Sequence, residues 1–173
     1  MVNGFSAKDL AASLGTSTLD DVKFVGKSVS TGCLVIDFLL QGGIPSGLIT
    51  EIVGDFSTGK SMLGIQLCRE AIKANGVAIL IDSENSLNKS WATDVLKVDS
   101  EKLIYFVADS LEETYDFIEN VALKVKGKAD SIIIVWDSIA ATPPKIFLEK
   151  TGDSNIAAAA RVNSSRIPII LKK

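Results

Sequence analysis

Residues 54–61 carry the most clearly defined chemistry in this sequence. They match the pattern G-x-x-x-x-G-K-[ST] in full and read Gly54, Asp55, Phe56, Ser57, Thr58, Gly59, Lys60 and Ser61. In this pattern the glycines let backbone N–H groups turn toward phosphate oxygens, and the N-terminus of the following helix adds partial positive charge. The Lys60 ammonium can reach the β- and γ-phosphates, and the Ser61 hydroxyl can ligate Mg²⁺. The sequence therefore predicts a nucleoside-triphosphate site.

The segments on either side of this loop have the composition that such a site requires. Residues 48–53 read as a strand, and residues 60–75 read as a helix. A glycine-rich turn that happens to carry a lysine is the alternative interpretation, and the strand–loop–helix order disfavours it.

Two further strand-like segments end in carboxylates. Asp137 follows the apolar run 132–136, at the position where a second Mg²⁺ ligand belongs, although an aspartate there can also serve a turn or a helix cap. Asp82 and Glu84 follow the apolar run 77–81, and a carboxylate at this place can orient the water that attacks a γ-phosphate. Chemistry alone leaves open which of the two does so, and both can also be solvated loop acids.

Trp91 lies shortly after Asp82 and Glu84, in a polar setting. An indole beside a nucleotide pocket can stack on a base. A partly buried packing residue is an equally good interpretation from the sequence alone.

Composition bounds the protein class. The chain has 173 residues, a net charge of −3, no histidine and two isolated cysteines. This length suits one domain, the cysteines are typical of reduced core residues in a cytoplasmic protein, and a zinc site is disfavoured. The sequence offers neither a broad basic face nor an apolar run long enough for a membrane span. We therefore expect no membrane partner, and any contact with nucleic acid must come from a local group of residues.

Helical and strand-like patterns alternate along the rest of the chain. A capping box at residues 6–9 opens a short helix that Gly15 ends, and a second box at 110–113 opens a helix with an apolar stripe. The remaining predicted elements are helices at 34–40 and 89–96 and strands at 77–81, 103–107 and 132–136. Apolar strands separated by helices predict an α/β fold, with a mostly parallel sheet that helices cover on both faces.

With these residues in place, the chain resembles RecA-type recombinases of bacteria and phages, from residue 30 to about residue 164. The resemblance rests on an ordered set of segments, namely residues 30–32, 42–47, 54–61, 81–84, 135–141, 152–154 and 159–161. It implies a P-loop NTPase core of the RecA-like kind over residues 30–173. Because the family's core continues past the matching stretch, it also implies a core that is incomplete at its C-terminal end. Residues 1–29 resemble the helical arm that packs on the adjacent subunit of a filament.

The same resemblance implies roles for single residues. Glu84, rather than Asp82, is then the water-activating carboxylate, and Trp91 stacks on adenine. Asn88 stands where the family usually has an aspartate near the adenine amino group. Ile156, in the region of the first DNA-binding loop, corresponds to an apolar side chain that wedges between bases, and Arg161 corresponds to an arginine that contacts a DNA phosphate.

The function that the resemblance implies is that of an ATP-dependent recombinase. Such a protein binds single-stranded DNA as a homo-oligomer or filament and hydrolyses ATP with Mg²⁺ in homologous recombination and DNA repair. The alternative is a nucleotide-binding module that docks on intact recombinase filaments without turnover. A hexameric helicase or clock-type ATPase is a third class, which residues 140–143 and 152–154 disfavour.

The tail of the chain gives one further structural prediction. In the family a strand lies between the phosphate-loop strand and the strand that ends in the metal-binding aspartate. Residues 167–171 have the apolar, β-branched composition to fill that place, and Pro168 is tolerable only at the start of such a strand. We expect the tail to form this central strand, after a helix shortened to about residues 157–164.

Overall fold

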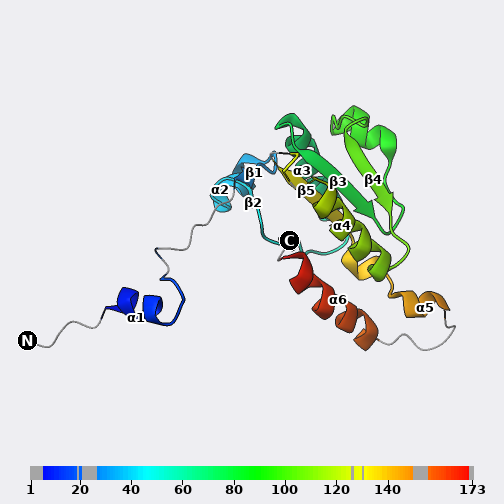
Figure 1. Ribbon diagram of the computed structural model, residues 1–173. Helices are drawn as coiled ribbons and strands as arrows, with labels where there is room; N and C mark the ends of the chain where they lie inside the picture. Colours follow the sequence, from blue (N-terminus) through cyan, green and yellow to red (C-terminus); the bar gives the residue numbers. More distant parts are fainter. Residues whose placement is uncertain are drawn as a thin grey trace, which may run out of the picture.

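A three-stranded parallel sheet forms the centre of the molecule (Figure 1). The computed structural model describes residues 6–18, 20, 27–125, 127–129, 131–149 and 156–171. Within it, β3 (Val77–Asp82) lies between β4 (Leu103–Val107) and β5 (Ile132–Asp137) and pairs in parallel with both. The register places Asp82 opposite Asp137. The predicted parallel sheet is confirmed, and two carboxylates end neighbouring strands at the same edge.

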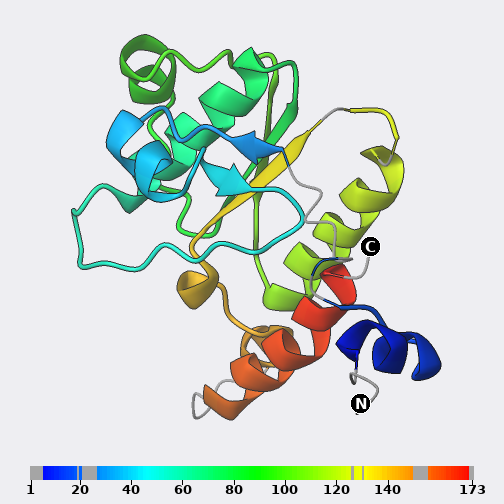
Figure 2. The ribbon, with the colours of Figure 1, turned by 90° about the vertical axis from the view of Figure 1, so that its left-hand side faces the viewer.

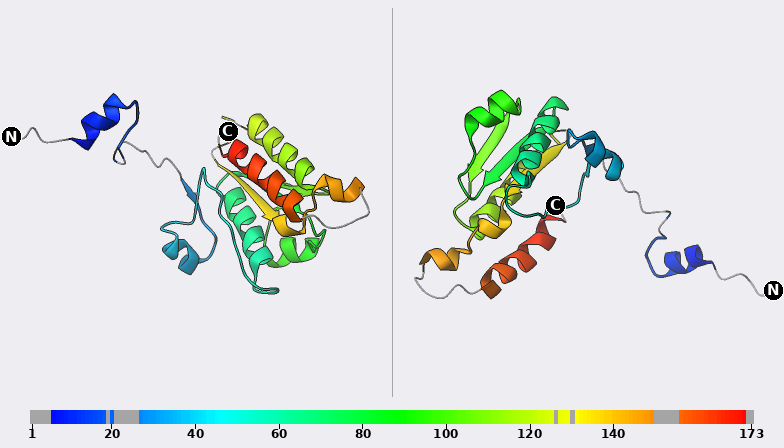
Figure 3. Two further views of the ribbon diagram at one scale, coloured as in Figure 1. Left: turned by 90° about the horizontal axis from the view of Figure 1, so that it is seen from below. Right: turned by 180° about the vertical axis from the view of Figure 1, so that it is seen from behind.

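Helices cover both faces of this sheet, as Figure 3 shows from below. On one face lies α3 (Lys60–Lys73), and on the other lie α4 (Leu111–Val125) and α6 (Ile156–Ile170). The core beneath α3 contains buried Ile65, Leu67, Cys68, Ala71, Ile72, Ala78, Leu80 and Ile133. The core on the opposite face contains buried Ile79, Ile81, Ala108 and Ile118, with Ile170 of α6 packed against them. Alternate residues of β3 thus face opposite layers, as a doubly covered strand requires.

The close approach of α3 to the sheet depends on Gly64. A Cβ added at this position would lie only 2.8 Å from Cγ1 of Val135 in β5. Because no real side chain tolerates such a contact without a shift, glycine allows the helix to lie directly on β5. The start of α3, which follows the glycine-rich loop, is thereby held close to the sheet.

The N-terminal elements form a separate group. The helix α1 (Ala7–Ser13) begins at Ser6, whose Oγ accepts a hydrogen bond from the amide of Asp9 at 3.4 Å, and it has no buried residue. In Figure 1 it lies apart from the sheet. The strands β1 (Ser28–Val29) and β2 (Ile44–Pro45) pair antiparallel around α2 (Leu34–Leu39). The two predicted helices are confirmed, and much of the stretch between them, residues 16–27, lies outside the described residues.

Short helical segments complete the connections. They are the π-helical turn η2 (Trp91–Val95), the 3₁₀ turn η3 (Ile139–Ala141) and the helix α5 (Lys145–Glu149). None of the described helices is long and apolar enough to cross a membrane.

The strand predicted for residues 48–53 is absent, and this prediction is wrong. The segment has no regular secondary structure, and Leu48, Ile49, Ile52 and Val53 are all exposed. Figure 2 shows it within the long loop that leads from β2 to α3. A strand is stabilised by the ladder with its neighbour, and in the described part of the chain β5 has β3 as its one partner. With no strand between β5 and this segment, the apolar composition alone does not produce a strand.

The prediction that the tail forms the central strand is also wrong. Residues 156–170 form the continuous helix α6, which runs through Pro168 and is therefore longer than the predicted helix. Its inner face packs on α4, where Arg166 donates to Asp116 at 2.8 Å and to Glu119 at 3.0 Å. Together with the packing of Ile170 against the core on this side, these contacts hold the tail on the face of the sheet instead of within it.

Candidate nucleotide-binding site

The glycine-rich loop closes around its own lysine. The Nζ atom of Lys60 donates to the carbonyl oxygens of Gly54 and Asp55 at 2.8 and 2.7 Å, and Thr58 Oγ1 donates to the same Asp55 carbonyl at 2.8 Å. Gly59 precedes α3 with a φ of +94°, a backbone conformation that L side chains rarely adopt. The loop is therefore a compact turn with a cation at its centre.

The start of α3 and the ends of two strands meet at one small pocket. Its volume is about 110 Å³, and its lining residues are Ser61, Ile65, Leu80, Asp82, Ser86, Leu87, Asn88, Trp91 and Asp137. Hydroxyl and carboxylate oxygens are the donors that Mg²⁺ prefers. The side chains of Ser61 and Asp137, which the sequence proposes as metal ligands, line the same cavity and so fit this ion.

The side chain of Asp82 accepts hydrogen bonds from the backbone of the turn that follows β3. It is 4% exposed, and it accepts hydrogen bonds from the amides of Glu84 at 3.1 Å and of Ser86 and Leu87 at 3.0 Å. The Tyr105 hydroxyl on β4 adds a fourth bond at 2.9 Å. The pKa of Tyr105 is raised to about 12, mainly by desolvation and to a smaller extent by the contact with Asp82. The alternative in which Asp82 is a solvated loop acid is thus wrong.

Glu84 has the opposite environment. Its side chain is exposed, and it is not among the residues that line the pocket. Its position is fixed through the backbone, because its amide is bound to Asp82 and the amide of the preceding Ser83 donates to the Asp137 carbonyl at 2.9 Å. Of the two carboxylates, Glu84 is the one whose oxygens are available to a water molecule.

Asn88 and Trp91 lie together at the adenine end that the sequence proposes. The Oδ1 atom of Asn88 accepts from the Trp91 amide at 3.0 Å and from the Ser90 hydroxyl at 2.8 Å, so Asn88 caps the turn η2. Trp91 is half-buried, packs against the α3-side core and lines the pocket. Both the packing role and a stacking role are compatible with this position.

Sequence reasoning missed a cluster beside this pocket, which consists of Trp136, Ser83 and Thr142 and which we call the Trp136 cluster. The indole Nε1 of Trp136 donates to Ser83 Oγ at 3.0 Å and to Thr142 Oγ1 at 2.9 Å. One signal was present in the sequence. A tryptophan at the end of a buried strand needs a partner for its N–H.

The two residues proposed to contact DNA lie away from this pocket. Ile156 begins α6, and Arg161 is an exposed residue further along the same helix. The side chain of Ile156 and residues 150–155 lie outside the described part of the chain. The structure therefore places the candidate DNA residues on the helix that covers α4, and not with the pocket-lining residues.

A parallel sheet covered by helices on both faces, with a glycine-rich loop that opens a helix at the edge where the strands end, defines an α/β core of the RecA-like class. Comparison with protein families agrees with this class. The model of the RecA N-terminal domain matches residues 7–171, and the chain belongs to the RecA family.

Three curated relatives of the chain are each named Protein RecA. The chain is 37% identical to Protein RecA of Nitratiruptor sp. over 162 residues, which are 92% of this chain and 44% of that protein. It is 40% identical to Protein RecA of Clostridium botulinum over 142 residues, 81% of this chain and 38% of the relative. For Protein RecA of Thermosynechococcus vestitus the identity is 32% over 168 residues, with coverages of 94% and 46%. The chain thus spans less than half the length of these relatives.

Proposed function

We propose that this chain binds ATP with Mg²⁺ between the loop of residues 54–59 and the ends of β3 and β5. The observation that carries the proposal is that Ser61 and Asp137 line one pocket together with Asn88 and Trp91. Lys60 would contribute its ammonium after leaving the loop carbonyls that it now contacts. The bound metal would neutralise phosphate charge, and Glu84 would orient the attacking water.

In this proposal the chain acts as a RecA-type recombinase that hydrolyses ATP on single-stranded DNA, in homologous recombination and DNA repair. Family membership supports this role, and α6 offers Arg161 as an exposed cation for a phosphate. Because the net charge is −3, DNA binding should rest on few contacts. It should be weak and should fall steeply as salt concentration rises.

The proposal also includes assembly into a filament through the N-terminal arm. The apolar side chains of Leu10 and Leu14 are 42% and 69% exposed, and α1 has no buried residue in this chain. A helix of this length gains stability from packing against another surface, and an adjacent subunit would provide one.

The second candidate function is a nucleotide-binding module that docks on intact recombinase filaments without turnover. The exposed position of Glu84, outside the residues that line the pocket, favours binding over hydrolysis in the chain by itself.

One experiment tests the proposed function and separates it from this second candidate. ATP affinity is measured by titration with Mg²⁺ and with EDTA, and steady-state hydrolysis is measured with and without single-stranded DNA, both alone and with an intact homologue. Hydrolysis stimulated by DNA supports the recombinase. Mg²⁺-dependent binding without turnover, together with co-assembly with the homologue, supports the module. Absence of ATP binding contradicts both.

A further inference from the structure

Trp136 stands between the two carboxylates on which the proposed function depends. It immediately precedes Asp137 in β5, and it donates to Ser83, which immediately precedes Glu84. The backbone already joins these strand ends through the bond from the Ser83 amide to the Asp137 carbonyl. The indole adds a second connection at the level of the side chains.

The Trp136 cluster has a consistent assignment for each of its hydrogens. Ser83 Oγ and Thr142 Oγ1 are 2.5 Å apart, and Thr142 Oγ1 also donates to the Ser138 carbonyl at 3.0 Å. Since each hydroxyl carries one hydrogen, Thr142 donates to Ser138 and Ser83 donates to Thr142. The indole N–H is then the donor that both oxygens share. Thr142 is 4% exposed, so water is a poor substitute for these partners.

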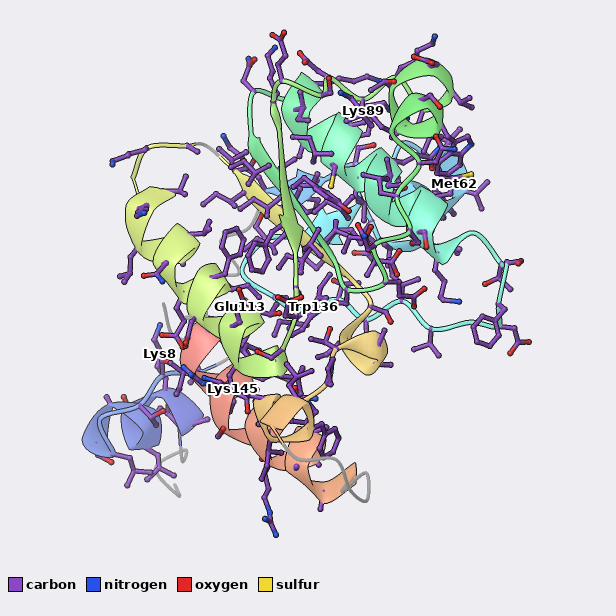
Figure 4. The ribbon with its side chains drawn as sticks, turned by 90° about the vertical axis from the view of Figure 1, so that its right-hand side faces the viewer. Lys8, Met62, Lys89, Glu113, Trp136 and Lys145 are labelled. Atoms are coloured by element: carbon purple, nitrogen blue, oxygen red, sulfur yellow. The ribbon has the colours of Figure 1, made fainter. Side chains whose placement is uncertain are left out.

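The ring itself also contacts an aromatic residue of α4. Tyr115 of α4, which is 2% exposed, meets the indole edge-on with 5.3 Å between ring centroids and 79° between planes. The Tyr115 hydroxyl in turn donates to Asn163 of α6 at 2.8 Å. Figure 4 shows Trp136 near the ends of the strands, beside the first turns of α4. The edge-on contact between the two rings, in which the Tyr115 hydroxyl takes no part, fixes the direction of the indole N–H.

We propose that Trp136 is a positioning residue whose indole N–H, through Ser83 and Thr142, fixes the turn that carries Glu84 relative to Asp137. This role rests on the proposed function, which assigns Glu84 to water orientation and Asp137 to the metal. The residue acts on the geometry between the two groups, and its own atoms lie outside the set that lines the pocket.

The test compares Trp136→Phe with Tyr115→Phe. The first variant removes the N–H and keeps an aromatic ring at the position. The second removes one hydroxyl from a buried aromatic that touches the same indole, so it is a matched control for a purely structural loss. The first readout is the hydrogen-exchange rate of the Ser83 amide in the ATP-free protein, relative to that of Leu80 within β3. The second is the ratio of ATP affinity with Mg²⁺ to ATP affinity with EDTA.

We expect Trp136→Phe to accelerate relative exchange at Ser83 about tenfold and to reduce the Mg²⁺-dependent gain in affinity by a similar factor, as for the loss of a shared hydrogen bond in a buried cluster. Tyr115→Phe should leave both ratios within about twofold of wild type. Equal ratios in the two variants would overturn the proposal, because Trp136 would then contribute only stability.

Ser83→Ala provides a second route if Trp136→Phe does not fold. It removes one hydroxyl from the cluster and should change both ratios in the same direction, whereas wild-type ratios would contradict the proposal. The two readouts also keep the hypotheses apart. A wild-type protein that shows no Mg²⁺-dependent ATP binding would contradict the proposed function, while the exchange rates would still decide whether Trp136 fixes the turn.

Discussion

Lys60 illustrates how a single residue can be bound before any ligand arrives. Its ammonium donates to two carbonyl oxygens of its own loop, and phosphate oxygens would replace these partners. The net gain is the difference between two sets of hydrogen bonds. We therefore expect Lys60→Ala to weaken ATP affinity about tenfold to a hundredfold, which corresponds to roughly 1.5–3 kcal/mol.

Isothermal titration of ATP with Mg²⁺ measures this effect. Lys73→Ala is the matched control, because Lys73 lies at the far end of the same helix in a surface ion pair with Glu70 at 2.9 Å. Equal affinities for wild type and Lys60→Ala would show that the nucleotide binds elsewhere.

The two carboxylates after β3 should respond differently to the loss of charge. Glu84→Gln should retain ATP binding within about twofold and abolish hydrolysis, because an amide does not accept the proton of the attacking water. Steady-state phosphate release, measured with the DNA and partner conditions under which wild type turns over, checks this outcome. A folded Asp82→Asn protein without activity, beside an active Glu84→Gln protein, would reverse the assignment.

Asp82→Asn should instead reduce stability. Its two carboxylate oxygens accept from three amides and from the Tyr105 hydroxyl, and an amide group has only one acceptor oxygen, so at least one of these donors would face an NH₂ group. We expect the free energy of unfolding to fall by about 1–3 kcal/mol in urea titrations. The surface variant Asp99→Asn, which affects an exposed ion pair with Lys102, should change it by less than about 0.5 kcal/mol.

Tyr105 makes this contact dependent on pH. Its pKa is raised to about 12 in the folded protein, against about 10 in an unfolded chain. The folded state therefore keeps a proton that the unfolded state loses, and stability from this group is complete below pH 10 and is lost as pH rises toward 12. Urea titrations at pH 9, 10 and 11 should show the advantage of wild type over Tyr105→Phe shrinking. A constant difference would contradict the coupling.

At the scale of elements, the sequence correctly predicted the helices and strands that depend on capping residues and on continuous apolar runs. The capping serines Ser6 and Ser110 accept from the amides of Asp9 and Glu113 as expected. The continuous apolar run of β3 is buried between two layers, whereas in β5 only Ile133 is buried and the residues that follow it are partly buried. The sequence also proposed Ser61 and Asp137 as ligands of one Mg²⁺ ion, and both residues line the same pocket.

The two wrong predictions concern strands whose stability would depend on distant partners. Residues 48–53 have strand composition, but strand propensity reflects packing against neighbours, and the described chain provides no neighbour there. In the tail, Asn163, Arg166 and Ile170 have the spacing i, i+3, i+7 of one helical face, and all three contact or pack against the layer of α4. This helical signal was present in the sequence, and the β-branched composition of residues 167–171 obscured it.

Pro168 gives a test of the helical tail. Inside α6 a proline has no N–H to donate to the preceding turn. Pro168→Ala should therefore raise the free energy of unfolding by about 1–2 kcal/mol, less than the full helix-interior penalty because the helix ends two residues later. Ser165→Ala, at an exposed position of the same helix, should add only a few tenths. An unchanged or reduced stability for Pro168→Ala would contradict a helix through this position.

At the scale of the whole molecule, the sheet is covered on its faces, while its two outer strands, β4 and β5, each pair only with β3 in the described part of the chain. In the described part of the chain β5 pairs with β3 alone, and the apolar segment 48–53 is exposed, with Val53 at 82%. Unpaired strand edges beside apolar side chains readily accept another strand. We therefore expect copies of this chain to associate through the free edge of β5.

This uncovered edge makes folding and association linked equilibria. If only the folded chain presents the edge of β5, mass action makes the apparent stability depend on how many copies are present. The thermal midpoint should then rise by a few degrees between about 1 and 100 μM protein, in parallel with the dimer fraction measured by analytical ultracentrifugation. A Val135→Pro substitution is a poor test of this edge, because it removes one backbone donor from β5 itself and introduces a ring. The better test is Val53→Lys, which changes an exposed residue of the segment 48–53. It should leave the fold intact and reduce the concentration dependence. A midpoint that is independent of concentration would mean that this molecule, despite its open edge, carries its whole stability within a single copy.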